Sequence, residues 1–108
     1  MELIELGTRN AFKSGTSLCF FVPKSWVGDH GLDFGEVVYL HCGAVTPELR
    51  YYTRKGPGRV PMLLQERPGG KPLLVIPKHA VERFGIEART PLSIFTNPKG
   101  TLIVRRAE

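Results

Sequence analysis

The sequence predicts a single, mostly β domain with two short helices, formed by two copies of one unit. The first observation is a duplication, because residues 15–41 match residues 69–95 without a gap at a spacing of 54 positions. The second is that short apolar runs alternate with Gly- and Pro-rich turns, which is typical of short strands. A unit of about 50 residues has only a marginal core, so the two copies are expected to pack against each other within residues 1–108.

The second copy is the easier one to divide into elements. Residues 73–76 are apolar on both faces, as in a strand buried on both sides. Pro77 suits the start of a helix and Gly85 suits its end, which predicts a helix over residues 78–84. The remaining elements are strands at 60–65, 92–95 and 102–104, with turns at 67–70 and 96–100.

The first copy repeats this order with local changes. Its strands are predicted at 3–6, 18–22, 37–40 and 49–52, its turn at 13–16 and its helix at 23–30, ended by Gly31. The loop between the last two strands is slightly longer than its counterpart in the second copy. The units are therefore residues 1–54 and 59–106, joined by a connector at 55–58.

Composition limits the classes of protein that the chain can belong to. A formal net charge of +5 and a pI near 9.6 favour a polyanionic partner such as nucleic acid. No run of about 18 apolar residues is present, and the N-terminal apolar segment is too short for a signal peptide. We therefore expect a cytoplasmic protein without a membrane partner.

The sequence offers no basis for an enzyme. His30, His41 and His79 are scattered, and none has a nucleophile or orienting acid at a recognisable spacing. Cys19 and Cys42 lack metal-ligand spacing, and Cys19 is expected to be a buried free thiol. We predict no catalytic residue, no metal and no cofactor.

Two segments carry a resemblance to a known family. Residues 74–86, with the sequence LVIPKHAVERFGI, resemble the signature of the AbrB/MazE/SpoVT swapped-hairpin DNA-binding family. Residues 13–27 resemble the variant common in archaeal members. The resemblance implies a swapped-hairpin barrel, here with both units in one chain, as a pseudo-dimer. A double-psi β-barrel uses the same order of elements and is the alternative fold.

The resemblance also implies a DNA-binding surface on the first strand, the basic turn and the helix start of each copy. Carried over position by position, the implied residues are Arg9, Lys13, Ser14, Thr16 and Lys24, then Arg67, Lys71 and Lys78, with Arg83 as a weaker member. Lys13 falls on Arg67 and Lys24 on Lys78 at the spacing of 54, so cationic positions are expected to recur. Arg9 falls on Leu63, so the two edges are expected to have diverged.

The region around the connector adds further candidates. Arg54, Lys55 and Arg59 are either additional nucleic-acid contacts or part of a solvated linker. Arg50, in the strand before them, is a further candidate for a phosphate contact.

These observations predict a protein that binds double-stranded DNA, as a transcription regulator or a chromatin-associated protein. The alternatives are a protein-interaction module, either an adaptor barrel or an antitoxin-like partner, and an RNA- or ribosome-binding protein. An adaptor would present an exposed apolar groove and would show little salt-sensitive binding of DNA. A DNA-binding protein of this charge would lose affinity steeply as salt is added.

Overall fold

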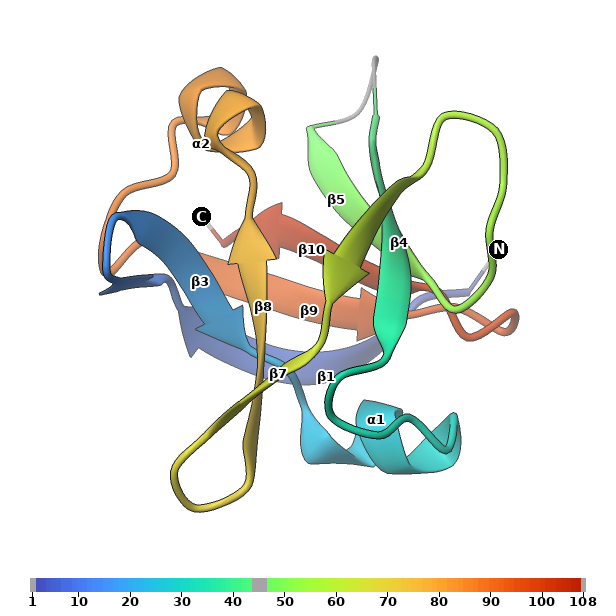
Figure 1. Cartoon of the computed structure of the whole chain (residues 1–108). Helices are drawn as coiled ribbons and strands as arrows, with labels where there is room; N and C mark the ends of the chain where they lie inside the picture. The colour runs from blue at the N-terminus through green and yellow to red at the C-terminus, as the bar shows by residue number, and fades with distance from the viewer. Residues whose placement is uncertain (1, 44–46, 108) are drawn as a thin grey trace.

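The computed structural model of the chain describes residues 2–43 and 47–107 (Figure 1). The central part of the predicted long loop, residues 44–46, lies outside the described residues. The elements of the first half are β1 (Ile4–Asn10), β2 (Phe12–Ser14), β3 (Ser17–Phe21), α1 (Lys24–Asp29), β4 (Val37–Cys42) and β5 (Glu48–Tyr52). Those of the second half are β6 (Val60–Leu63), β7 (Gln65–Arg67), β8 (Lys71–Ile76), α2 (Lys78–Phe84), β9 (Pro91–Thr96) and β10 (Leu102–Arg106).

The strands form two antiparallel sheets. The larger sheet has six strands in the order β1-β9-β10-β5-β4-β6, and the smaller has four in the order β2-β3-β8-β7. The bounds of β4 and β9, and those of β5 and β10, are separated by the 54 residues of the sequence duplication. The prediction of a mostly β chain with two short helices is confirmed.

Strands of the two halves pair with each other in both sheets. The first strand of each half pairs with the fourth strand of the other, β1 with β9 and β6 with β4. The halves also meet at β3–β8 in the smaller sheet and at β5–β10 in the larger one. Both sheets therefore contain strands from both copies, and neither copy has a sheet of its own.

The first strand of each half is divided in two at a buried residue. In the first half, the strand predicted at 3–6 continues as β1 to Asn10, and the turn predicted at 13–16 begins within β2. In the first half the break is at Ala11, whose N–H bonds the carbonyl of Thr90 and whose carbonyl accepts from Arg89. In the second half Leu64 makes the equivalent pair of bonds with Glu36 and Gly35. At each break the chain passes from the larger sheet to the smaller, so the predicted single strand at 60–65 is in fact β6 and β7.

These breaks also end the strand ladders. Among the described residues the ladders form two open sheets, with β1 and β6 at the edges of one and β2 and β7 at the edges of the other. The barrel closure expected from the sequence is not observed in this pairing. The physical reason is that each bent first strand contributes its two parts to different sheets.

The helices lie at opposite ends of the molecule (Figure 1). α2 begins after Pro77 and ends at Gly85, whose φ of 65° is the left-handed conformation that glycine adopts easily, as the sequence predicted. α1 is shorter than the predicted 23–30. Its Trp26 is buried and donates a hydrogen bond of 2.9 Å to the carbonyl of Gly100 in the β9–β10 turn.

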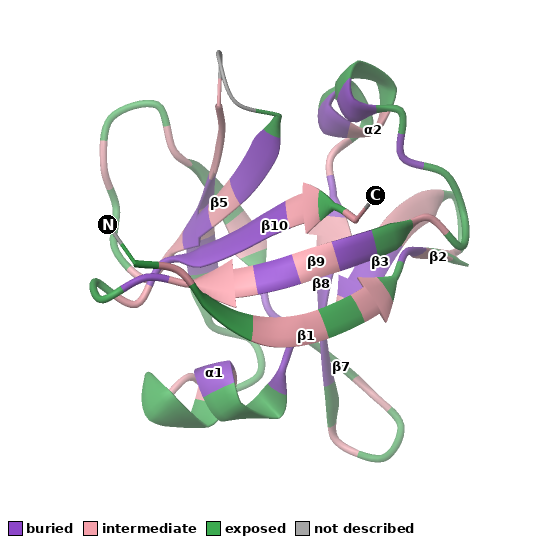
Figure 2. Cartoon of the chain, turned by 180° about the vertical axis from the view of Figure 1, so that it is seen from behind, coloured by how far each residue is buried: buried purple, intermediate pink, exposed green. Residues whose placement is uncertain are grey.

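The core lies between the two sheets. Phe20 and Leu74, which are opposite each other in the β3–β8 ladder, are fully buried and face the larger sheet. Figure 2 shows buried residues along β5 and β10, in the middle of that sheet. Of the apolar residues of α2, Ala80 and Phe84 are buried and Val81 is half-buried against the same core. Within the described residues, no helix has the length and apolar character needed to cross a membrane.

Candidate nucleic-acid interface

The outward face of the four-stranded sheet carries two stacked phenylalanine rings. Phe12 lies opposite Cys19 in the β2–β3 ladder, and Phe21 is two residues further along β3, so all three point to one face. The ring centroids of Phe12 and Phe21 are 4.7 Å apart, with an angle of 27° between the planes. Both residues are half-buried. A partly exposed aromatic pair is a surface on which another flat ring can stack.

Two basic side chains lie over this aromatic pair. The guanidinium carbon of Arg67 is 5.7 Å from the ring centroid of Phe12, and the Lys71 Nζ is 5.6 Å from that of Phe21. Arg67 and Lys71 are opposite each other in the β7–β8 ladder, which places them on the same face. Arg67 also donates a 2.8 Å hydrogen bond to the hydroxyl of Ser14, which fixes its guanidinium group.

Two further cations lie beside Phe21. Arg9 from β1 and Lys24 from the start of α1 line a hollow of about 390 Å³ together with Phe21 and Lys71. In the described part of the chain, the recorded ion pairs involve none of these basic residues. The surface is called here the aromatic–cationic face, and it consists of Arg9, Phe12, Phe21, Lys24, Arg67 and Lys71.

Cys19 lies beneath this face and is only 1% exposed. Burial raises the pKa of its thiol, and this effect exceeds the lowering by the charge of Arg67. The thiol is therefore protonated near neutral pH, and it is not in a disulfide. The prediction of a buried free Cys19 is confirmed.

The expected correspondence between Lys13 and Arg67 is wrong by one residue. Arg67 pairs with Lys71 immediately before a loop of three residues, whereas Ser14 pairs with Ser17 before a turn of two. Ser14 is thus the structural counterpart of Arg67, and Lys13 corresponds to Glu66. Lys13 lies opposite Leu18, which places it on the other side of the sheet from Phe12.

A β-bulge causes this shift. The register between β1 and β9 changes by one residue between Glu5 and Gly7, so residues 7–14 are offset by 53 rather than 54 from their counterparts. The three-residue loop at 68–70 restores the spacing of 54 before β8. An ungapped alignment of the two copies therefore assigns the wrong counterpart to every residue from 7 to 14.

The corrected register shows that only half of the outward face is basic and aromatic. The symmetry-related half replaces Phe12 by Gln65, Phe21 by Val75 and Lys71 by Ser17, and it retains only a lysine, Lys78, in place of Lys24. The sequence predicted that the two basic edges differ at Arg9. The structure shows a larger difference, because the symmetry-related half also lacks the aromatic pair. A polyanion would find one suitable surface here rather than two.

The other predicted residues lie outside the contacts that form this face. Thr16 and Lys78 are exposed, in the β2–β3 turn and at the first position of α2. Arg83 lines a separate hollow of about 280 Å³ together with Cys42 and His79. The Cys42 Sγ and the His79 Nε2 are 3.6 Å apart, and burial raises the pKa of this thiol as well.

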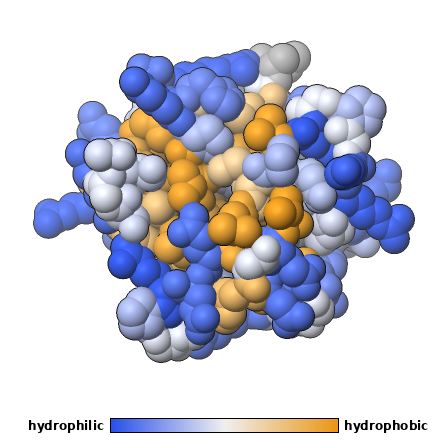
Figure 3. Space-filling view, viewed as in Figure 1, coloured by the Kyte–Doolittle hydropathy of each residue, from blue (hydrophilic) through white to orange (hydrophobic). Residues whose placement is uncertain are grey.

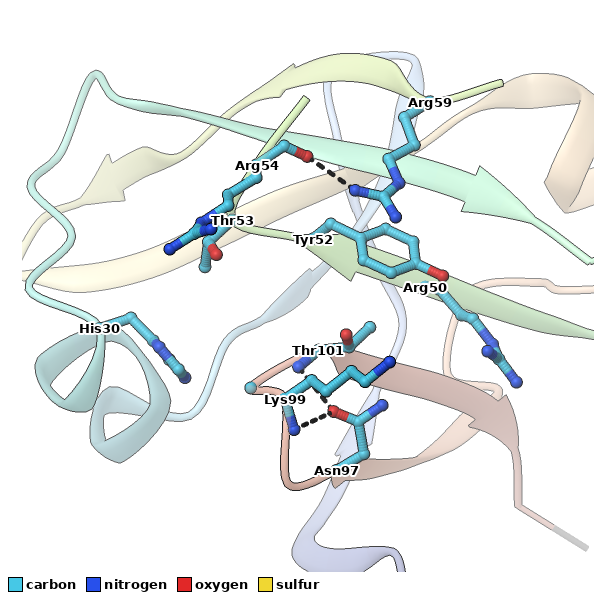
Figure 4. Close-up of a pocket in the computed structure, with 10 residues that line it drawn as sticks. His30, Arg50, Tyr52, Thr53, Arg54, Arg59, Asn97, Lys99 and Thr101 are labelled. Atoms are coloured by element: carbon cyan, nitrogen blue, oxygen red, sulfur yellow. Dashed lines mark hydrogen bonds between the residues drawn. The ribbon is translucent and has the colours of Figure 1, made fainter. Parts of the chain in front are cut away.

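The connector contributes to a second basic region, a cleft of about 670 Å³ (Figure 4). Of the three connector candidates, Arg54 and Arg59 line the cleft, whereas Lys55 is exposed and only its carbonyl faces the Arg59 guanidinium. The cleft brings these residues together with Arg50, a further predicted phosphate contact, and with two basic residues that the sequence did not single out for binding, His30 and Lys99. The remaining lining residues are Tyr52, Thr53, Asn97, Gly100 and Thr101.

A buried carboxylate lies behind this cleft. Glu48 is 1% exposed, and its two oxygens pair with Arg50 and with Arg105 of the adjacent strand β10, the latter at 2.9 Å. Arg50 is thus partly neutralised. The charge of Glu48 is compensated within the sheet and is not available to a ligand.

The described residues contain no group of three or more His, Cys, Asp or Glu side chains that could hold a metal ion. No protein-family model, curated protein or solved structure matches this chain. What the chain binds must therefore be argued from the two basic regions themselves.

Proposed function

We propose that this protein binds nucleic acid through the aromatic–cationic face, with duplex DNA as its partner, as a transcription regulator or chromatin-associated protein. The observation that carries the proposal is the set of four cations, Arg9, Lys24, Arg67 and Lys71, around the half-exposed ring pair. Lysine and arginine neutralise phosphates and release counterions, which supplies most of the affinity for DNA.

The β7–β8 hairpin is the part of the face best placed to approach a duplex. It projects from the body of the molecule, at the lower left of Figure 1, and carries Arg67 and Lys71 on either side of its loop. A two-stranded ribbon fits the width of the major groove. Lys24 and Arg9 line a hollow together with Lys71 of the hairpin, where they are suited to phosphate contacts.

The fold that we propose is the swapped-hairpin arrangement of the AbrB type, with both halves in one chain. The reciprocal pairing of β1 with β9 and of β6 with β4 supports it, because each half lends its first strand to the other. The double-psi barrel remains the alternative topology. Since only one half of the outward face is basic, the proposed DNA site is not palindromic.

A second candidate function, protein interaction, is favoured by one observation. Val37 and Leu63 are opposite each other in the β4–β6 ladder and are 37% and 50% exposed. Figure 3 shows apolar side chains over β8 and β6 in the middle of the view of Figure 1. Because β6 is an edge strand, the exposed apolar strip formed by Val37 and Leu63 is suited to contact with another protein chain.

Fluorescence anisotropy with labelled duplex DNA, single-stranded DNA and structured RNA, at low and moderate salt, tests the proposal. The double variant Lys24→Glu/Lys71→Glu is expected to lose duplex binding, whereas Lys13→Glu, on the other side of the sheet, retains it. Tighter binding of single strands would favour base stacking on the aromatic pair over binding to a duplex. Equal affinity of all three proteins for duplex would refute the proposed face.

A further inference from the structure

The cationic cleft of Figure 4 has the composition of an anion site. Arg50, Arg54, Arg59 and Lys99 line it together with His30, and no acidic residue is among the described residues that do so. Arg54, Arg59 and Lys99 form no ion pair in the described structure. Like charges gathered in a concave site repel one another, and a bound anion would relieve that repulsion.

Two of the walls are held rigidly. The Arg59 guanidinium lies 3.5 Å from the ring centroid of Tyr52 and donates a hydrogen bond of 3.1 Å to the carbonyl of Arg54. Opposite, the Asn97 Oδ1 accepts from the backbone N–H groups of Lys99 and Thr101, at 3.0 Å each, which fixes the β9–β10 turn. The Arg59 guanidinium and the backbone that carries Lys99 are therefore positioned before any ligand arrives, which lowers the entropic cost of binding.

The cleft is separate from the aromatic–cationic face. The two regions share no lining residue. They lie at the two ends of α1: Lys24 at its start belongs to the face, and His30 just beyond its end belongs to the cleft. A cleft of about 670 Å³ is in the size range of sites for small molecules. The charged residues of the cleft come from the end of α1, from β5, from both sides of the connector and from the β9–β10 turn. They would therefore contact a compact ligand from several sides.

We infer that this cleft binds a small polyphosphate anion, of the inorganic tripolyphosphate or nucleoside triphosphate class. Several phosphate groups in one compact ligand would engage Arg54, Arg59 and Lys99 together, with charge-assisted hydrogen bonds from each. Arg50, whose charge is shared with Glu48, contributes less. The proposal is independent of nucleic-acid binding at the aromatic–cationic face.

Isothermal titration calorimetry of the full chain with sodium tripolyphosphate, and separately with ATP, tests the inference. The wild-type protein is expected to bind tripolyphosphate with a stoichiometry of one. Arg54→Glu and Lys99→Glu should each weaken binding by about tenfold or more, because each removes a charge-assisted contact and introduces repulsion. Lys13→Glu, with the same change in net charge outside the cleft, should bind as wild type, and circular dichroism checks that all variants are folded.

The two ligands distinguish the source of the phosphates. Equal affinities for tripolyphosphate and ATP would identify the polyphosphate chain as the recognised group. Tighter binding of ATP than of tripolyphosphate would identify a nucleotide as the ligand. Absence of binding to the wild type would overturn the inference, as would an equal loss in Lys13→Glu and in the cleft variants. Neither result would affect the anisotropy test of the face, because its test variant changes Lys24 and Lys71, which lie outside the cleft, and its ligand is DNA.

Discussion

The salt dependence of DNA binding can be worked out from the four cations of the aromatic–cationic face. If Arg9, Lys24, Arg67 and Lys71 each neutralise one phosphate, log K should fall with log salt with a slope of about −3.6 for duplex DNA. Between 50 and 200 mM NaCl, this slope corresponds to a loss of about 150-fold in affinity.

The perturbation that isolates one of these contacts is Lys71→Gln. It removes a single charge from the exposed end of β8, so the slope should become about −2.7 and the loss over the same range about 40-fold. Fluorescence anisotropy titrations at four salt concentrations measure both slopes. Lys13→Gln is the matched control and should leave the slope at its wild-type value. An unchanged slope in Lys71→Gln, or an equal change in both variants, would refute the assignment of Lys71 to the interface.

Three further predictions concern stability. Glu48→Ala should lower the free energy of unfolding by about 2 kcal/mol in urea titrations, because two arginines lose their buried partner; an unchanged midpoint would contradict this. Burial raises the pKa of Tyr51, so only the unfolded chain releases this proton near pH 10, and stability should fall by up to about 1.4 kcal/mol per pH unit above that. Tyr51→Phe should abolish that part of the loss, and an identical pH profile would show that Tyr51 is not its origin. Gly28→Ala in α1 meets no neighbour and should raise the thermal midpoint, whereas Gly100→Ala, at a φ of 81°, would meet the His30 ring and should lower it; a reversed order would contradict the geometry.

The parts of the fold that local sequence determines were predictable. Pro77 marks the start of α2 because it lacks an N–H that the start of a helix does not need. Gly85 marks its end because glycine adopts a positive φ easily. The run in β8 that is apolar on both faces indicates an interior strand, and β8 indeed lies between β3 and β7 in the smaller sheet. In contrast, the bends at Ala11 and Leu64 depend on hydrogen bonds to distant loops, so no local pattern indicates them.

The candidate site was predictable only in part. Arg9, Lys24, Arg67 and Lys71 were identified by type and position, but the bulge in β1 shifts the register and removes Lys13 from the set. Phe12 was missed because it adjoins a segment that reads as a turn, although it belongs to a strand. The cleft was missed because Lys99 and His30 lie on elements far in sequence from Arg50, Arg54 and Arg59, and these elements meet only in the folded chain.

The most direct test of the central claim is an amide NMR titration of the labelled protein with a short DNA duplex. We expect resonance shifts at Phe12, Phe21, Arg67 and Lys71, on the basic half of the outward face, and at Ser14, which accepts a hydrogen bond from Arg67. Residues of the symmetry-related half, such as Gln65 and Lys78, should remain unchanged. Shifts confined to the strip at Val37 and Leu63, or no shifts at all, would contradict nucleic-acid binding at this face.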